Sequence, residues 1–156
     1  MTEREAARLV AWSDELHRVH ARLRAALRTT RIELHDGALP AVVSRDLLLY
    51  CHGFCTALGE HHRGEDRTLF PAIEAAHPEL APVLRKLEQD HSMIDFLVAE
   101  LDAALQDHAQ ADEIDRHLDG VAAIMENHFA YEERQLLKVL KTLVLHDDPR
   151  VVLGEL

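Results

Sequence analysis

The sequence has few of the residues that mark the special classes of protein. Its 156 residues include only two cysteines, six glycines and five prolines. These numbers exclude a disulfide-stabilised scaffold, a collagenous chain and a low-complexity chain. Basic residues are also in the minority, because 17 of them stand against 28 acidic residues and give a formal net charge of −11. That charge argues against a nucleic-acid binder and against docking on an anionic membrane.

Long apolar runs are missing as well. No stretch of about 18 apolar residues occurs, and the first residues are charged, so we expect neither a membrane span nor a secretory signal. A cytoplasmic protein is therefore expected. Cys51 and Cys55 lie four residues apart in a helical pattern, where a disulfide between them would be strained. Two buried free thiols are the first interpretation of this pair, and a redox pair is the alternative.

What the sequence does contain is an apolar pattern with the period of a helix. Apolar residues recur at spacings of three and four almost throughout, and no stretch alternates convincingly with period two. Pro71 is expected to kink the second helix or to split off its last turn, because proline lacks the N–H that a helix interior uses. The four predicted helices cover about residues 4–34, 41–76, 78–107 and 112–145.

The connections between these helices are short. Gly37 and Pro40 separate the first two helices, and Pro149 follows the last one. Short connections make successive helices antiparallel neighbours, so we predict an all-α, up-down-up-down antiparallel four-helix bundle. A chain of this length suits one hydrophobic core. We therefore expect a single domain, 1–156, with the bundle over about residues 4–145 and a short C-terminal tail, 146–156.

Polar residues interrupt the apolar stripe near the middle of each predicted helix. His20, for example, lies between Leu16 and Leu23 on the stripe of the first helix. A helix face that packs in a core should be apolar, so polar residues on it need a reason. Buried carboxylates need a positively charged partner, and a metal ion is the partner that suits a mixture of imidazoles and carboxylates. The candidate metal ligands are His20, His61, Glu65, His91, His128 and Glu132.

Two of the helices carry a histidine and a glutamate four residues apart. These pairs are His61 with Glu65 and His128 with Glu132. Residues with this spacing lie one above the other on a helix, so one helix can offer an imidazole and a carboxylate to the same metal centre. Chance placement of 12 histidines would itself give about one such pair. The prediction therefore rests on the position of both pairs on apolar stripes rather than on their number.

His62 with Asp66 is an alternative pair, one residue out of phase with His61. We prefer His61 because its face continues that of Leu58, whereas the face of His62 continues that of Cys55. The other histidines are expected on polar faces, at helix ends or off the main stripe, and these are His17, His35, His52, His77, His108, His117 and His146.

Three short segments and one further histidine carry a resemblance to a known family. The segments read His-His-Arg-Gly-Glu-Asp-Arg-Thr-Leu-Phe-Pro at 61–71, Asp-His at 90–91 and His-Phe-Ala-Tyr-Glu-Glu at 128–133, and His20 precedes them in the first helix. In this order they resemble the hemerythrin-like (HHE cation-binding) domain family over about residues 16–140. The resemblance implies a four-helix bundle that holds a non-heme diiron centre with two bridging carboxylates and an oxo or hydroxo bridge. By position, it implies Glu65 and Glu132 as bridging ligands, and as terminal ligands His20, His61, His91 and His128.

One histidine of the oxygen-carrying members of this family is missing from its usual place. Those members carry a His-x-x-x-His pair on the third helix, whereas the positions four residues either side of His91 hold Leu87 and Asp95. This departure argues against simple reversible oxygen carriage. It leaves one more open or water-filled iron position, or it lets Asp95 bind the metal. The candidates to orient His91 through its other ring nitrogen are Glu88, Asp90 and Asp95.

The ligand types limit the metal and its chemistry. Imidazole with carboxylate suits iron, manganese or zinc, and we expect two iron ions ahead of manganese or zinc. The histidine-rich set has fewer carboxylates than a ferritin-like site, so demanding C–H oxidation is not expected.

Three functions remain open from the sequence. The leading one is a non-heme diiron protein that binds or reduces dioxygen, hydrogen peroxide or nitric oxide, with catalase-like or peroxide-reducing activity undecided. The second is a redox, oxygen or iron sensor that acts through a partner protein. The third is a zinc-holding or metal-free interaction bundle. The sequence identifies no electron donor or protein partner, and it contains no phosphate-binding loop and no nucleophile elbow.

Overall fold

The computed structural model describes residues 3–36 and 45–154, and the side chains of residues 12–34 and 51–154. These residues form helices joined by short connections, and no strand occurs among them. The predicted all-α class is therefore confirmed. The turn at Gly37 and Pro40 and the start of the second predicted helix lie outside the described residues. The helices are α1 (Glu3–Asp36), α2 (Arg45–Gly64), the π-helical turn η1 (Glu65–Leu69), α3 (Phe70–Ala76), the 3₁₀-helix η2 (Pro78–Leu80), α4 (Ala81–Gln106), α5 (Ala111–Leu140) and α6 (Pro149–Leu153).

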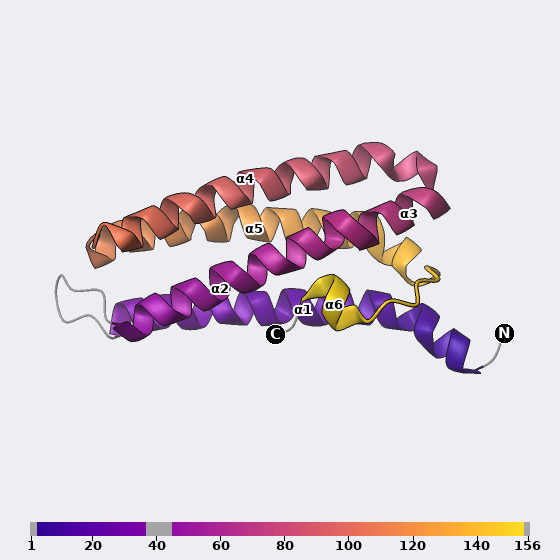
Figure 1. Ribbon diagram of the computed structural model, residues 1–156, viewed down its shortest axis with the longest axis horizontal. Coiled ribbons are helices and arrows are strands. Elements are labelled where there is room, and N and C mark those ends of the chain that lie inside the picture. Colours follow the sequence, from indigo (N-terminus) through magenta and orange to yellow (C-terminus); the bar gives the residue numbers. More distant parts are fainter. Residues whose placement is uncertain (1–2, 37–44, 155–156) are drawn as a thin grey trace.

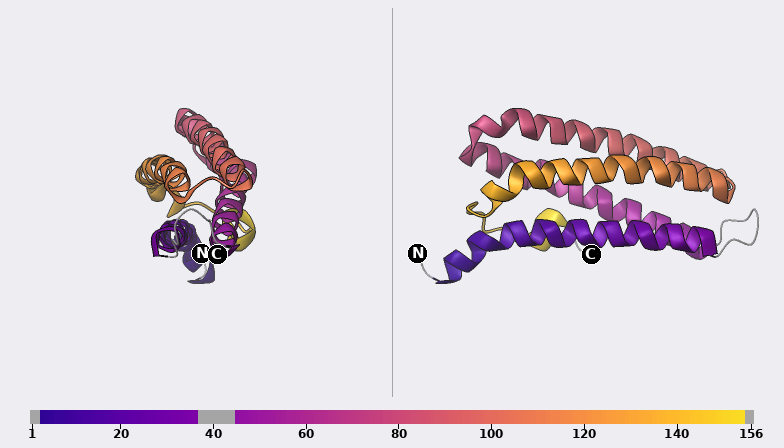
Figure 2. Two further views of the ribbon diagram at one scale, coloured as in Figure 1. Left: turned by 90° about the vertical axis from the view of Figure 1, so that its left-hand side faces the viewer. Right: turned by 180° about the vertical axis from the view of Figure 1, so that it is seen from behind.

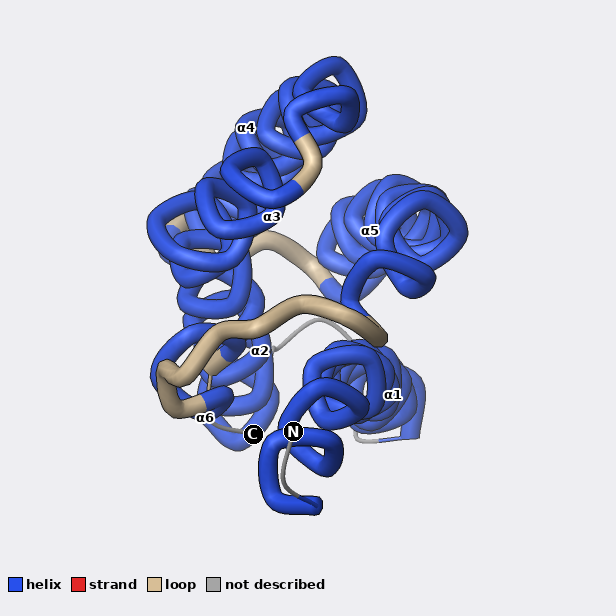
Figure 3. Tube along the Cα trace, turned by 90° about the vertical axis from the view of Figure 1, so that its right-hand side faces the viewer, coloured by secondary structure: helices blue, strands red, loops and turns tan. Residues whose placement is uncertain are grey.

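The long helices form four rods, namely α1, α2 with η1 and α3, α4, and α5. These rods lie lengthwise beside one another (Figure 1). The second rod consists of α2, η1 and α3, which follow one another without a break. α1 contacts α2 and α5, and α4 contacts α5 and α2, so the rods surround a common interior. Figure 3 shows the rods end-on, and Figure 2 shows α1 and α5 from the opposite side to Figure 1.

The apolar stripes that the sequence predicts make the core. Leu16 and Leu23 of α1, and Leu58 of α2, are at most 1% exposed. Because burial of apolar surface drives helix packing, these stripes decide which face of each rod turns inward. The polar residues on the same stripes are therefore carried into the interior. The matching core residues on α4 and α5 are Leu84, Leu87, Ile94, Leu101, Ile114, Leu118, Val121, Phe129 and Leu136.

The second rod departs from a regular α-helix just after Gly64. The N–H of Phe70 donates to the carbonyl of Glu65, five residues earlier, which is the spacing of a π-helix. Pro71 then stands in the first turn of α3, where its missing N–H is tolerated. The predicted irregularity is present, but it begins at Glu65 rather than at Pro71.

The C-terminal part differs from the expectation in two ways. α5 ends at Leu140 rather than at Leu145, and the chain then turns toward α1, where Trp12 Nε1 donates to the carbonyl of Leu145 at 3.0 Å. The segment expected to be a tail contains α6, which contacts α1, α2 and η1. Among the described residues, no helix is both long enough and apolar enough to cross a membrane.

Candidate metal centre

Seven polar side chains meet in the middle of the bundle interior, and none is more than 2% exposed. They come from α1, α2, η1, α4 and α5, so every rod contributes at least one of them. All six candidate ligands from the sequence are among them, and the seventh is His62. The seven are His20, His61, His62, Glu65, His91, His128 and Glu132.

These side chains form two overlapping groups, each with four ligand atoms that lie within 4.8 Å of one another. Glu65 belongs to both groups. The first group otherwise contains histidines only, and the second contains two histidines and Glu132. In full, the groups are His62, Glu65, His91 and His128, and His20, His61, Glu65 and Glu132.

Each carboxylate lies between a histidine of one group and a histidine of the other. Glu65 Oε1 is 3.4 Å from His61 Nε2 and 3.3 Å from His91 Nε2. Glu132 Oε2 is 3.6 Å from His20 Nε2 and 3.3 Å from His128 Nε2. This position between two groups is the one that a bridging carboxylate of a two-metal centre needs.

Several buried atoms of this cluster lack a hydrogen-bond partner among the described residues. They are Nε2 of His20, Nε2 of His61, both ring nitrogens of His62, and all four carboxylate oxygens of Glu65 and Glu132. A buried polar atom without a partner costs about 1–3 kcal/mol, so a protein interior does not collect them without compensation. Imidazole nitrogen with carboxylate oxygen is a donor set for iron, manganese or zinc. The residues present therefore fit a bound cation.

Four of the five histidines are held in place through Nδ1, which leaves Nε2 toward the interior. Three of them have carboxylate partners. His20 Nδ1 lies 2.8 Å from Glu133 Oε1, His91 Nδ1 lies 2.7 Å from Asp66 Oδ1, and His128 Nδ1 lies 3.2 Å from Asp90 Oδ2. The fourth, His61, donates from Nδ1 to the backbone carbonyl of Leu153 at 2.9 Å. Such partners fix the tautomer and the orientation of histidine ligands.

The expected partners of His91 are wrong, because Asp66 of the neighbouring rod takes that position. Asp90 points instead to His128 on α5, and Glu88 pairs with Arg85 on the surface. Asp95 is exposed, so it does not enter the cluster. Successive residues of a helix point about 100° apart, which explains why the neighbour of one ligand reaches a ligand on a different helix.

The sequence favours His61 over His62, and the structure brings both side chains into the cluster. The interior lies between their two directions. His61 approaches the His20 ring of α1 with centroids 5.2 Å apart, whereas His62 stacks on the His91 ring of α4 at 4.0 Å. Two adjacent histidines before a glutamate were the sequence signal for this arrangement. His62 also raises the histidine number to five without a His-x-x-x-His pair on α4.

Burial sets the protonation of the cluster. Burial lowers the pKa of His61 to about 3, with a smaller contribution from His20, and it lowers the pKa of His62 well below its ordinary value. Burial and the neighbouring Glu132 raise the pKa of Glu65 well above its usual range. Burial alone would also raise the pKa of Glu132, but Glu65, His128 and His20 lower it well below that range. The neutral imidazoles of His61 and His62 suit cation binding, and a cation would displace the proton that the raised pKa of Glu65 retains.

Aromatic rings pack against the histidines and restrict their movement. Phe129 stacks on His20 with centroids 3.9 Å apart and an interplanar angle of 9°. Phe70 stacks on His91 at 5.5 Å. On the outer side of Phe129, the Arg24 guanidinium lies 5.3 Å from the ring and pairs with Glu133 at 3.1 Å.

The other histidines and the cysteines lie away from the cluster. Cys51 is buried, Cys55 is half-buried, and both are free thiols. Among the remaining histidines, His17, His52, His108 and His146 are exposed, His77 and His117 are half-buried, and the side chain of His35 lies outside the described residues.

Comparison with known proteins agrees with this geometry. The family model for the hemerythrin HHE cation binding domain matches residues 13–140, a span that contains all seven clustered side chains and ends before α6. Neither a curated protein nor a solved structure matched the chain. The order and spacing of the ligand-type residues, their convergence in one bundle interior and the family match agree. This chain belongs to the hemerythrin HHE cation-binding domain family.

Proposed function

We propose that this protein is a non-heme diiron protein that binds or reduces a small oxidant, namely dioxygen, hydrogen peroxide or nitric oxide. The observation that carries the proposal is the pair of overlapping ligand groups joined by Glu65. Two groups that share the carboxylate of Glu65 suit two ions rather than one. The proposal includes an up-down-up-down four-helix topology, with α2, η1 and α3 as its second rod, and a cytoplasmic location.

The chain's own residues define the chemistry that the centre could support. Iron, when bound, supplies a coordination position for the oxidant and a change between ferrous and ferric states. His62, His91 and His128 offer three nitrogens to one ion, whereas His20 and His61 offer two to the other. The two-histidine group therefore has more room for an added ligand.

Burial of the cluster limits the size of the oxidant. Because none of the seven side chains is more than 2% exposed, only a small molecule can reach them through the bundle. Glu133 and Asp66, which orient two of the histidines, are 17% and 40% exposed at the side chain and link these imidazoles to solvent. These two carboxylates accept hydrogen bonds from Nδ1 of His20 and His91, so Nε2 of each ring faces the interior.

Metal analysis of protein purified without a tag is the first test. The proposal expects about two irons per chain, bound so that Glu65→Ala lowers this content. Zinc alone, or no metal, would leave the interaction-bundle interpretation and rule out the diiron protein.

Peroxide consumption is the second test, because disproportionation of two H₂O₂ to O₂ and two H₂O needs no external electron donor. A catalase-like enzyme loses this activity in Glu132→Ala and retains it in Glu113→Ala, an exposed glutamate on the same helix. A wild type with two irons and no peroxide turnover would favour ligand binding or sensing over catalysis.

A second candidate function, a redox, oxygen or iron sensor, is favoured by one contact. His61 is held by the carbonyl of Leu153, which lies 92 residues later in the chain. A change at the metal centre that moves His61 would therefore also move the C-terminal segment, and a partner protein bound to that segment could detect the change.

A further inference from the structure

α6 touches the metal centre although it lies outside the residues that the family model matches. The carbonyl of Leu153 accepts a hydrogen bond from His61 Nδ1 at 2.9 Å. The three histidines oriented by carboxylates have partners within residues 13–140. His61 alone among the four oriented histidines depends on a backbone group of another segment. The group that orients His61 therefore lies outside the residues that the family model matches.

α6 is held against α2 by close backbone contact. A Cβ atom at Gly64 would lie 1.7 Å from the carbonyl oxygen of Val152, so only glycine fits there. Val152 and Leu153 are at most 1% exposed, which anchors the inner face of α6. Gly154 has a φ of +93°, a conformation that favours glycine, and a Cβ there would approach the backbone nitrogen of His61 at 3.5 Å.

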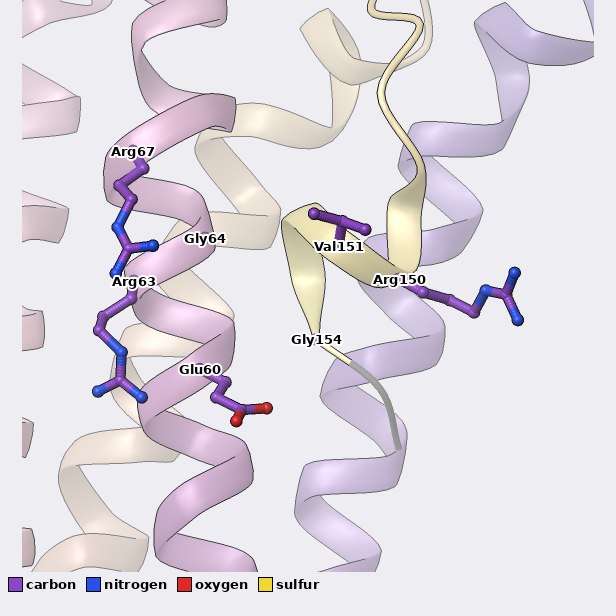
Figure 4. A pocket seen from close by; sticks show the side chains of 7 residues that line it. All are labelled: Glu60, Arg63, Gly64, Arg67, Arg150, Val151 and Gly154. Atoms are coloured by element: carbon purple, nitrogen blue, oxygen red, sulfur yellow. The ribbon is translucent and has the colours of Figure 1, made fainter.

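Figure 4 shows the outer side of this junction, a surface pocket of about 350 Å³ between α2, η1 and α6. Gly64 faces α6 in this view, while the side chains of Arg63 and Arg67 lie along the rod and Arg150 points away from them. The contact between α6 and α2 therefore depends on the glycine and on the buried face of α6, not on these arginines.

We propose that α6 is a positioning element of the metal centre, in which the Leu153 carbonyl holds His61 with Nε2 toward the second ligand group. The proposal rests on metal binding by the clustered residues. Partners that orient histidine ligands contribute about 10- to 100-fold to metal affinity. Because coupling between two binding events is reciprocal, metal binding strengthens the docking of α6 by the same factor that docking strengthens metal binding. Loss of metal then weakens the docking of the C-terminal segment by that factor.

Gly64→Ala tests the proposal in the full-length protein. The added methyl group collides with the Val152 carbonyl and displaces α6, whereas alanine is otherwise favourable in a helix. We expect one of two metal ions to be released to a chelator about 10- to 100-fold faster than from the wild type. Gly53→Ala on the same helix is the matched control, because its added Cβ meets no described atom within 4 Å apart from the neighbouring backbone of its own helix. This variant should release metal at the wild-type rate.

A second pair of variants displaces α6 from its own side. Val152→Asp places a charge on the buried face of α6, while Val151→Asp places the same charge on a residue that is 78% exposed. Hydrogen exchange of residues 149–154 should rise in Gly64→Ala and Val152→Asp, and in the wild type it should rise when metal is removed. Thermal unfolding of the metal-free variants checks that each one is folded.

The outcomes separate the two proposals. If the wild type binds no metal, the proposed function fails. If the wild type and both displacing variants bind two ions and release them at rates within about two-fold of one another, α6 has no positioning role and only this inference fails. If metal does not change the hydrogen exchange of residues 149–154, the claim that metal binding strengthens the docking of α6 is wrong.

Discussion

His61 and His62 illustrate what a single side chain contributes to this centre. Their directions from α2 differ by about 100°, and the cluster occupies the space between them. His61 faces the two-histidine group and is held by Leu153, whereas neither ring nitrogen of His62 has a hydrogen-bond partner among the described residues. A buried ring with two unpartnered nitrogens needs another partner, and a cation is the partner that suits the surrounding imidazoles and carboxylates.

Replacement of His62 by alanine should therefore lower the metal content or affinity. The variant loses one of the three histidine nitrogens in its group. Mutation of a group that only orients a histidine ligand already lowers metal affinity about 10- to 100-fold, so we expect loss of the ligand itself to weaken metal binding at least 10-fold. The measurement is metal content per chain after dialysis against a chelator. His52→Ala is the control, because His52 is exposed on the same helix. Equal metal retention in both variants would show that His62 is not a ligand.

The two thiols give a prediction about pH. Burial raises the pKa of Cys51 to about 11 and that of Cys55 to about 12. The folded protein therefore keeps protons that the unfolded chain releases above about pH 8.5, so these groups make the free energy of unfolding fall as the pH rises beyond that value. Alkylation by iodoacetamide at pH 8.5 should be at least about 100-fold slower in the folded protein than in urea.

That alkylation rate should also increase steeply between pH 9 and 11. Rapid reaction of either thiol at pH 8 would contradict the interpretation of Cys51 and Cys55 as buried, unreactive thiols and would favour the alternative of a redox pair.

The rods show how one helix can serve both packing and chemistry. α5 carries core residues such as Leu118, Phe129 and Leu136 on the stripe that also presents His128 and Glu132.

On the second rod, the π-turn begins at Glu65 itself. An extra residue in a helical turn shifts the register of the residues that follow, and such turns are common at functional sites. The turn lets the rod present Glu65 to the cluster while Leu69 and Phe70 remain in the core.

Gly120 lies at an exposed position within α5 where nothing requires a glycine. Apart from the neighbouring backbone of α5, no described atom lies within 4 Å of a Cβ built on it. Gly120→Ala should raise the free energy of unfolding by about 0.5–1 kcal/mol, because glycine loses more conformational freedom than alanine in a helix. For a chain of this size, that corresponds to an increase of about 1–4 °C in Tm. Thermal unfolding of the metal-free protein measures it, and a lower Tm than the wild type would contradict the prediction.

Considered together, the seven buried polar side chains oppose the stability of the bundle when no cation is present. Each unpartnered atom lowers stability by about 1–3 kcal/mol, an appreciable fraction of the 5–15 kcal/mol that folded domains usually have. The apolar layers above and below the cluster, with Leu16 and Leu23 on either side of His20, keep the bundle together. We therefore predict that metal binding and folding are thermodynamically linked.

Removal of metal should lower the stability of the whole molecule. When free metal is about 1,000 times Kd, binding stabilises the folded state by about 4 kcal/mol. Chelation should lower Tm by about 10 °C, given about 2–4 °C per kcal/mol for a chain of this length, and metal addition should restore it. Differential scanning calorimetry with and without chelator measures the change. Glu65→Ala should show little dependence on metal, and an unchanged wild-type Tm would contradict the linkage.

The spacing of residues along the chain is sufficient to predict the long helices, their inward faces and six of the seven clustered side chains. This works because side-chain direction repeats every 3.6 residues in a helix, so His20 must share a face with Leu16 and Leu23. Metal binding by these residues stays a prediction, as do the identity of the metal and the oxidant.

Contacts between helices could not be predicted in the same way. Asp66 orients His91, and Leu153 orients His61, across 25 and 92 residues of chain. His62 enters the cluster because α2 is adjacent to both α1 and α4, and α6 docks because Gly64 leaves room for its backbone. Helical periodicity determines where each side chain points from its own helix, but the packing of the helices decides what it meets. The two histidine groups are therefore a property of the packed bundle, while the residues that form them can largely be read from the chain.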